Sequence, residues 1–276
     1  MQRFSSAGST LAYFESGSGL PIIFLHPTPF DHQYWRPLIG ELKDVRAIAP
    51  DFRGHGASEL GSDLPVGLFS RVPDAPVLTM RQLARDTLAL LDTLGIKSAV
   101  FVGCSVGGSV LLELWRQAPE RMRGLAFICS KPQPESEADW ERRAATIAAA
   151  RAGKTLSIYD AMVQSLIGAT ARARHPEIVA EMRATMTVTP EGLVAMQAGL
   201  AKRPDSRPTV ASITVPVLAI AGGEDPGITF DEMRAFEAAP GGCTFHALAD
   251  AGHLAAYEQP HAVVCWFAEW LRAFAH

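Results

Sequence analysis

The stretch Val100-Phe101-Val102-Gly103-Cys104-Ser105-Val106-Gly107-Gly108 decides the fold that this chain is expected to adopt. Its first residues are apolar without polar alternation, which is typical of a strand covered on both faces. Gly103 and Gly107 flank Ser105, and a helical pattern follows. A sharp turn from strand to helix needs small flanking residues, because larger side chains would clash with nearby backbone. The stretch therefore predicts a serine hydroxyl exposed at the carboxyl edge of a sheet, beside a helix N-terminus that favours negative charge.

Short apolar runs alternate with helical patterns along the rest of the chain. The first residues, to about Phe14, predict an antiparallel hairpin at the sheet edge. The clearest helix begins at Thr79, where a capping-box pattern stands, and another runs from near Pro260 to the C-terminus. This alternation predicts an α/β fold with a mostly parallel, eight-stranded sheet and helices on both faces. The predicted strands after the hairpin are Pro21–His26, Val45–Asp51, Ala99–Cys104, Leu125–Ser130, Val215–Ala221 and Cys243–Leu248.

Two stretches interrupt the alternation. Residues 59–78 form a long segment with several Pro and Gly residues, and loops of this length are usually functional lids or disordered. Residues 131–208 contain only helical patterns, and proline-rich segments mark both ends. We expect a helical cap at 131–208, inserted between the first part of the core, 1–130, and its second part, 209–276.

Composition restricts the class of partner. The 276 residues are 48% hydrophobic and 20% charged, with a formal net charge of −4, so neither nucleic acid nor an anionic membrane is an expected partner. No signal peptide and no apolar run long enough to span a membrane is apparent, which predicts a soluble, cytoplasmic protein. The expected partner is a small-molecule substrate, and a homodimer is left open. The four cysteines, Cys104, Cys129, Cys243 and Cys265, lack metal spacing and are interpreted as buried thiols.

A serine hydroxyl becomes nucleophilic only beside a base, usually a histidine oriented by a carboxylate. Asp225 follows the predicted strand 215–221, and His253 follows the last predicted strand. Both positions lie at the same sheet edge as Ser105. Glu224 and Asp250 are alternative acids. Glu224 lies one residue before the favoured position, and Asp250 lies too close to His253 along the chain. The predicted catalytic residues are therefore Ser105, Asp225 and His253.

Ser105, Asp225 and His253, in this chain order, resemble the α/β-hydrolase superfamily over nearly the whole chain. The stretch Asp51-Phe52-Arg53-Gly54-His55-Gly56-Ala57-Ser58 is similar to the turn after the fourth strand of that family. The branch of closest resemblance comprises the serine arylesterases, the cofactor-free perhydrolases (bacterial haloperoxidases) and related lactonases. Epoxide hydrolases and haloalkane dehalogenases of this fold use aspartate at the position of Ser105, so neither activity is expected.

The resemblance also implies an oxyanion hole. In this branch the third strand ends in His-Gly, followed by a residue whose N–H is one donor. Here His26-Pro27 replaces that pair, and the donor would be Thr28. Pro29 biases Thr28 towards an extended backbone and matches a proline of the perhydrolase branch. The second donor would be the N–H of Val106.

The predicted substrate is a small to medium, largely apolar ester, lactone or thioester, cleaved by a carboxylesterase-like serine hydrolase without metal or organic cofactor. No cluster of Arg or Lys in the cap demands an anionic substrate. The alternatives are a C–C bond hydrolase, a perhydrolase, and a non-catalytic ligand-binding protein with the same fold. The predicted substrate-binding side chains are apolar or aromatic: Phe30, Trp35, Trp140, Tyr159, Met162 and Leu254.

Overall fold

The computed structural model of the protein describes residues 1–274. One sheet of eight strands organises this part of the chain, in the order β1-β2-β4-β3-β5-β6-β7-β8. Only β1 and β2 run antiparallel to their neighbours, and they form the expected hairpin at one edge. The strands are β1 (Gln2–Ser6), β2 (Ser9–Gly17), β3 (Leu20–Leu25), β4 (Val45–Pro50), β5 (Ala99–Cys104), β6 (Met122–Ile128), β7 (Val217–Gly222) and β8 (Cys243–Leu248).

The predicted α/β fold and its mostly parallel sheet are thus confirmed. Two of the predicted strands, β5 and β8, have the predicted bounds. β6 begins at Met122, earlier than predicted, because Ala99 pairs with Met122 at its start. The interior of β5 is buried on both faces: Val100 and Val102 belong to one apolar cluster, and Phe101 belongs to the other.

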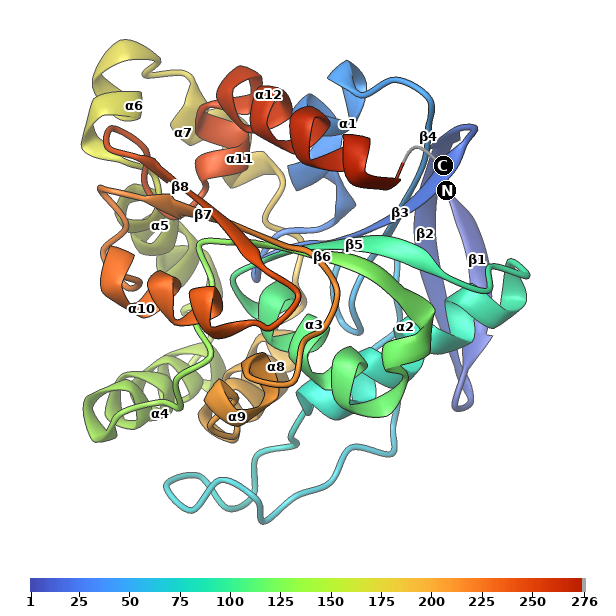
Figure 1. Ribbon diagram of the computed structural model, residues 1–276. Coiled ribbons are helices and arrows are strands. Elements are labelled where there is room, and N and C mark those ends of the chain that lie inside the picture. The colour runs from blue at the N-terminus through green and yellow to red at the C-terminus, as the bar shows by residue number, and fades with distance from the viewer. Residues whose placement is uncertain (275–276) are drawn as a thin grey trace.

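Helices cover both faces of the sheet (Figure 1). One layer contains α1 (Arg36–Glu41), α11 (Ala255–Glu258) and α12 (Pro260–Leu271); the other contains α2 (Met80–Thr93), α3 (Val106–Gln117) and α10 (Phe230–Arg234). The Thr79 hydroxyl caps α2 by accepting from the Gln82 N–H at 3.1 Å, but the Gln82 side chain donates to Asp86 at 3.0 Å, so the predicted capping box is only half formed. The buried face of α12 carries Val263, Phe267 and Trp270. Four short 3₁₀ helices complete the described elements: η1 (His32–Trp35), η2 (Pro119–Arg121), η3 (Ala235–Ala238) and η4 (Arg272–Phe274).

Six helices lie between β6 and β7, in the region where the sequence predicts a cap. α8 is buried almost along its whole length, whereas α5 alternates buried and exposed residues and α4 is buried only at Ile147 and Ala150. Figure 1 shows α4 to α7 on the side of the molecule where the carboxyl ends of β6, β7 and β8 lie. These helices are α4 (Glu137–Arg151), α5 (Thr155–Leu166), α6 (Ala169–Arg174), α7 (Ile178–Ala184), α8 (Pro190–Ala201) and α9 (Arg207–Val210).

The segment 59–78 contains no helix or strand, yet it packs against the inserted helices. The Phe69 ring meets the Trp140 ring edge-on at 6.3 Å between centroids. The Arg71 guanidinium stacks over Trp140, and the Leu78 N–H donates to the Ala195 carbonyl at 3.0 Å. The segment therefore joins the core to α4 and α8.

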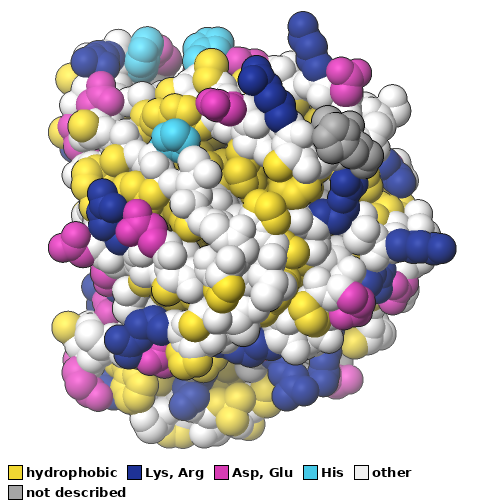
Figure 2. Space-filling view, viewed as in Figure 1, with side chains coloured by type: hydrophobic (Ala, Val, Ile, Leu, Met, Phe, Trp, Pro, Cys, Tyr) yellow, Lys and Arg dark blue, Asp and Glu magenta, His cyan; other side chains and the backbone are white. Residues whose placement is uncertain are grey.

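Surface features agree only in part with the sequence expectations. Cys104 and Cys129 are buried thiols, but Cys265 is exposed and Cys243 is partly exposed, because they lie on the outer helix α12 and the edge strand β8. On the face shown in Figure 2, charged side chains of both signs are dispersed among apolar ones. No helix within residues 1–274 combines the length and the apolar character required to cross a membrane.

Candidate active site

Ser105 occupies a strained turn between β5 and α3. Its backbone has φ 54° and ψ −115°, in the positive-φ region that side-chain-bearing residues rarely adopt. A Cβ atom on Gly103 would lie 2.5 Å from the Gly107 carbonyl carbon. A Cβ atom on Gly107 would lie 2.9 Å from the Leu25 carbonyl carbon of β3. The two glycines are thus required because the turn passes so close to neighbouring backbone.

Asp225 and His253 meet at the same edge of the sheet. Asp225 lies just after β7, and its Oδ2 is 2.7 Å from His253 Nδ1. Its Oδ1 accepts from the backbone N–H groups of Gly227 and Ile228, at 2.8 and 3.1 Å. These bonds fix the carboxylate, and the carboxylate in turn orients the imidazole, so that Nδ1 carries the proton and Nε2 is free to accept one.

Two carboxylates raise the pKa of His253. Burial lowers the pKa of the imidazole, but the Asp225 charge and its hydrogen bond, together with the Glu258 charge, raise that pKa above its ordinary value of 6.5. Glu258 itself is held by the backbone N–H groups of Gly252 at 2.8 Å and Leu254 at 3.1 Å. Both residues adjacent to His253 in the chain are therefore anchored to one carboxylate.

Ser105 and His253 line one cavity together with Asp225 and Thr28, and its volume is about 430 Å³. Among the hydrogen bonds of residues 1–274, none joins the Ser105 hydroxyl to the His253 ring. Hydrogen bonds of this kind are often long before a substrate binds. The arrangement offers a hydroxyl, a base and an orienting acid around a common space.

The predicted oxyanion donors lie beside this space. Thr28 lines the cavity, and its N–H donates to no other group in the described part of the chain. Val106 is the first residue of α3, so its N–H has no acceptor within the helix. The Thr28 hydroxyl lies 2.9 Å from His55 Nε2, and the Thr28–Pro29 peptide bond is cis.

Two buried histidines support the Thr28 loop. Burial lowers the pKa of His26 to about 4 and that of His55 to about 3, so both are neutral near pH 7. His26 Nε2 accepts from the Phe52 N–H at 2.9 Å, and its Nδ1 is 3.0 Å from the Pro27 carbonyl oxygen. His55 Nδ1 is 2.9 Å from the Arg53 carbonyl oxygen. The two rings thus connect the loop after β3 to the loop after β4.

The alternative acids are engaged elsewhere. Glu224 accepts from the backbone N–H of Thr170 at 2.9 Å and from its hydroxyl. Asp250 pairs with Arg174 at 2.8 Å and accepts from Gln259 at 2.6 Å. Asp225 is the acid that contacts the His253 ring.

The family model described as "Alpha/beta hydrolase family" matches residues 22–264. The chain belongs to the alpha/beta hydrolase family. Its relatives include 3-oxoadipate enol-lactonase 1 of Acinetobacter baylyi, which is 27% identical over 91% of this chain and 88% of that protein. This alpha/beta hydrolase also resembles a solved thermophilic esterase from Thermogutta terrifontis with malate bound (30% identity, TM-score 0.88, 99% of each chain). The enol-lactonase from Burkholderia xenovorans LB400 is similar as well (26% identity, TM-score 0.85, 98% of this chain and 100% of that one). The predicted resemblance is confirmed.

Most of the predicted substrate-binding side chains of this hydrolase do not line the cavity. Only Met162 does. Four are buried in the apolar core: Phe30, Trp35, Tyr159 and Leu254. Trp140 packs against Phe69 and Arg71. These predictions were wrong because large apolar side chains gain most by complete burial, and the sequence does not show whether they face the core or the cavity.

The cavity has an apolar wall and a charged end. The wall is formed largely by α5, through Ile158, Ala161, Met162 and Leu166. The charged end contains Lys131, Glu135, Asp139, Arg142, Arg143 and Arg203, with Gln197 beside them. The structure therefore gathers basic side chains at one end of the cavity, where the sequence showed no cluster of Arg or Lys that demands an anionic substrate. Helical spacing could have placed Arg143 on the inner face of α4, because Ile147 and Ala150 are buried at i+4 and i+7.

One group of potential metal ligands stands out in residues 1–274, namely Asp31, His32 and Asp51, whose ligand atoms lie within 4.8 Å of one another. Protein groups already engage these atoms. Asp51 accepts from the His32 ring at 2.7 Å and from the Ala57 N–H at 3.0 Å. Asp31 caps η1 by accepting from the Gln33 N–H at 2.8 Å. The cluster is a structural network that fixes the loop after β3.

Proposed function

We propose that this alpha/beta hydrolase is a serine hydrolase that cleaves a small to medium carboxylic ester or lactone through an acyl-enzyme on Ser105; a thioester would be cleaved in the same way. The observation that carries the proposal is the convergence of Ser105, at its strained turn, with the His253–Asp225 pair on one cavity. The ester and lactone classes are supported by the esterase and the enol-lactonases to which the chain is similar.

The reaction would begin when His253 Nε2 accepts the proton of the Ser105 hydroxyl as the serine oxygen attacks the carbonyl carbon. Asp225 would stabilise the imidazolium. The N–H groups of Thr28 and Val106 would donate to the oxyanion, and such donors contribute about 3–4 kcal/mol each to transition-state stabilisation in other enzymes. His253 would then protonate the leaving alcohol. Water activated by His253 would release the acid and regenerate Ser105.

The substitution Ser105→Ala tests this mechanism. We expect it to abolish hydrolysis of p-nitrophenyl acetate while the thermal unfolding temperature stays near that of the native protein, because alanine removes only the hydroxyl. The native protein should react stoichiometrically with a fluorophosphonate, and the variant should not. Ser62→Ala, at an exposed position, is the matched control and should retain both hydrolysis and fluorophosphonate labelling. Retained turnover in the Ser105 variant would refute the assigned nucleophile.

A substrate panel separates this proposal from the other reactions compatible with the same three residues. Faster cleavage of vinylogous diketones than of esters would indicate a C–C bond hydrolase. Halide oxidation that depends on acetate and peroxide would indicate a perhydrolase. If the protein shows neither turnover nor fluorophosphonate labelling, it is a non-catalytic ligand-binding protein. Within the proposal, a series of acyl esters, lactones and thioesters identifies the preferred bond.

A further inference from the structure

The charged end of the cavity is built around one shared carboxylate. Glu135 accepts from Arg143 Nε at 3.0 Å and from Arg143 Nη2 at 2.8 Å, and it also pairs with Arg203 Nη2. The Glu135 side chain is 2% exposed and the Arg203 side chain 9% exposed. Two nearly buried guanidinium groups therefore share a single carboxylate, which leaves one positive charge of this group uncompensated.

The neighbouring charges do not remove this excess. Arg142 pairs with Asp139 at 2.5 Å, and Lys131 pairs with Glu232 at 2.9 Å. Both are one-to-one pairs, so the four cationic side chains of the charged end are matched by only three carboxylates. An excess positive charge in a partly desolvated site is costly unless an anion compensates it.

The two arginines also retain donors that the protein does not use. A guanidinium has five N–H donors. Arg143 uses both Nε and Nη2 on Glu135 and donates through Nη1 to the Gln197 side-chain oxygen at 2.8 Å. Arg203 donates through Nη1 to the Ser109 hydroxyl at 2.9 Å, and its buried Nε has no partner in the described structure. Each guanidinium is thus held in place while some of its N–H groups remain without a protein acceptor.

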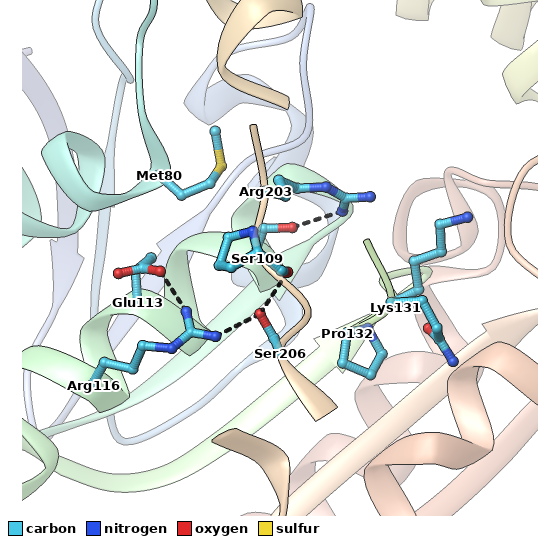
Figure 3. A pocket seen from close by; sticks show the side chains of 10 residues that line it. Met80, Ser109, Glu113, Arg116, Lys131, Pro132, Arg203 and Ser206 are labelled. Atoms are coloured by element: carbon cyan, nitrogen blue, oxygen red, sulfur yellow. Dashed lines mark hydrogen bonds and ion pairs between the residues drawn. The ribbon is translucent and has the colours of Figure 1, made fainter. Parts of the chain in front are cut away.

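This group lies close to the proposed nucleophile. Figure 3 shows the guanidinium of Arg203 bonded to Ser109, on the side of α3 where Arg116 reaches Glu113 and Ser206. Ser109 follows Ser105 by one helical turn, and its N–H donates to the Ser105 carbonyl at 3.4 Å. One turn advances an α-helix by about 5.4 Å. A ligand that reaches both Ser105 and Arg203 can therefore be small.

We propose that Arg143 and Arg203 form a subsite for a carboxylate carried by the substrate, so that the natural substrate is an ester or lactone with an acidic group away from the scissile bond. This inference rests on the proposed function and specifies its substrate class. A carboxylate matches the subsite because guanidinium groups bind it through paired, charge-assisted hydrogen bonds. Its single charge also equals the excess charge at this end of the cavity. The remainder of the substrate would contact the apolar wall of α5.

A matched pair of chromogenic esters tests the subsite: 4-nitrophenyl hydrogen glutarate, which carries a free carboxylate, and its methyl ester, which is neutral. The native enzyme should have a higher kcat/KM for the acid. Arg143→Gln should lower kcat/KM for the acid by roughly 10- to 100-fold, which corresponds to the loss of a charge-assisted interaction. The same substitution should change kcat/KM for the neutral ester by less than about threefold. Arg143→Lys, which keeps the charge, should have a smaller effect.

Arg151→Gln is the matched control, because Arg151 lies on the same helix, pairs with Asp74 at 3.0 Å and does not line the cavity. It should leave both reactions unchanged. If Arg143→Gln does not fold, inhibition of the native enzyme by small acids tests the subsite instead. Glutarate should inhibit hydrolysis of the neutral ester competitively at a concentration at least about tenfold below that of uncharged glutaramide.

The outcomes distinguish the subsite from the proposed function. An equal fall in kcat/KM for both esters in Arg143→Gln, or equal inhibition by glutarate and glutaramide, would overturn the subsite while esterase activity stands. Absence of turnover of either ester by the native enzyme, without fluorophosphonate labelling, would overturn the proposed function itself. A fall in kcat/KM for the acidic ester alone in Arg143→Gln and Arg203→Gln, but not in Arg151→Gln, would support the carboxylate subsite.

Discussion

Single residues in the Ser105 turn carry constraints that the backbone geometry of the turn imposes. Ser105 has a positive φ, which costs of order 1–3 kcal/mol and persists only where the surrounding structure enforces it. Here β5 and α3 hold the turn from both sides, and the Ser130 hydroxyl donates to the Ser105 carbonyl at 2.9 Å. Gly103 and Gly107 let the turn approach neighbouring backbone. The strain is therefore maintained by packing around the turn.

We expect Gly107→Ala to disrupt this turn. The added Cβ would overlap the Leu25 carbonyl group, which is β3 backbone and cannot rotate away. The variant should unfold at a clearly lower temperature and lose the proposed esterase activity. Gly40→Ala is the control, because Gly40 lies in α1 and a Cβ there would meet nothing within 4 Å. That change should be neutral or stabilise the protein by about 0.5–1 kcal/mol. A Gly107→Ala variant with native stability and activity would contradict the required close approach.

At the scale of elements, a buried ion pair fixes α2 against the hairpin and the loop after β4. Arg53 donates to both oxygens of Asp86, at 2.6 and 2.8 Å, and also to the Ser9 hydroxyl at 2.6 Å. Asp86 also accepts from the Ser6 hydroxyl at 2.7 Å. One pair therefore joins the β1–β2 hairpin, the 51–58 loop and α2, which together support the loop that holds Thr28.

Asp86→Ala should destabilise the protein by about 3–5 kcal/mol, because it leaves the Arg53 guanidinium, 4% exposed, without its carboxylate. Denaturant unfolding measures this change in free energy. Asp92→Ala serves as the control on the same helix. Asp92 pairs with Arg121 but is 68% exposed, so its loss should have little effect. Similar stabilities for the two variants would refute a structural role for the Arg53–Asp86 pair.

At the scale of the whole molecule, the inserted helices are joined to the loops of the candidate site on two sides. On one side, the Thr187 and Val188 N–H groups donate to the Pro29 carbonyl, at 3.1 and 3.3 Å. On the other side, the His253 N–H donates to the Leu166 carbonyl at 2.8 Å, and the Gly168 N–H donates to Glu258 at 3.0 Å. A shift of α5 or α6 would therefore be transmitted to His253.

The pH dependence of the proposed reaction tests whether the Glu258 charge acts on the pKa of His253. In the proposed mechanism His253 must be neutral to accept the serine proton. Because its pKa is raised above 6.5, kcat/KM should fall as the pH drops through a value above 6.5. Glu258→Gln removes a charge that raises this pKa, so the acidic limb should move to lower pH. Glu120→Gln, an exposed change, should leave the limb in place. Lower activity with an unmoved limb would show that Glu258 acts only through structure.

The sequence by itself indicated the α/β class, the succession of strands and helices along the chain and three residues of a candidate triad. Those features depend on local patterns, since apolar runs, glycine spacing and positions just after strands are written in consecutive residues. The tertiary structure decided which side chains face the cavity. Phe30 and Trp35 are core residues, and Arg143 and Arg203 converge on Glu135 from separate segments. Such convergence depends on how the inserted helices pack across the sheet edge, and no local pattern encodes that packing.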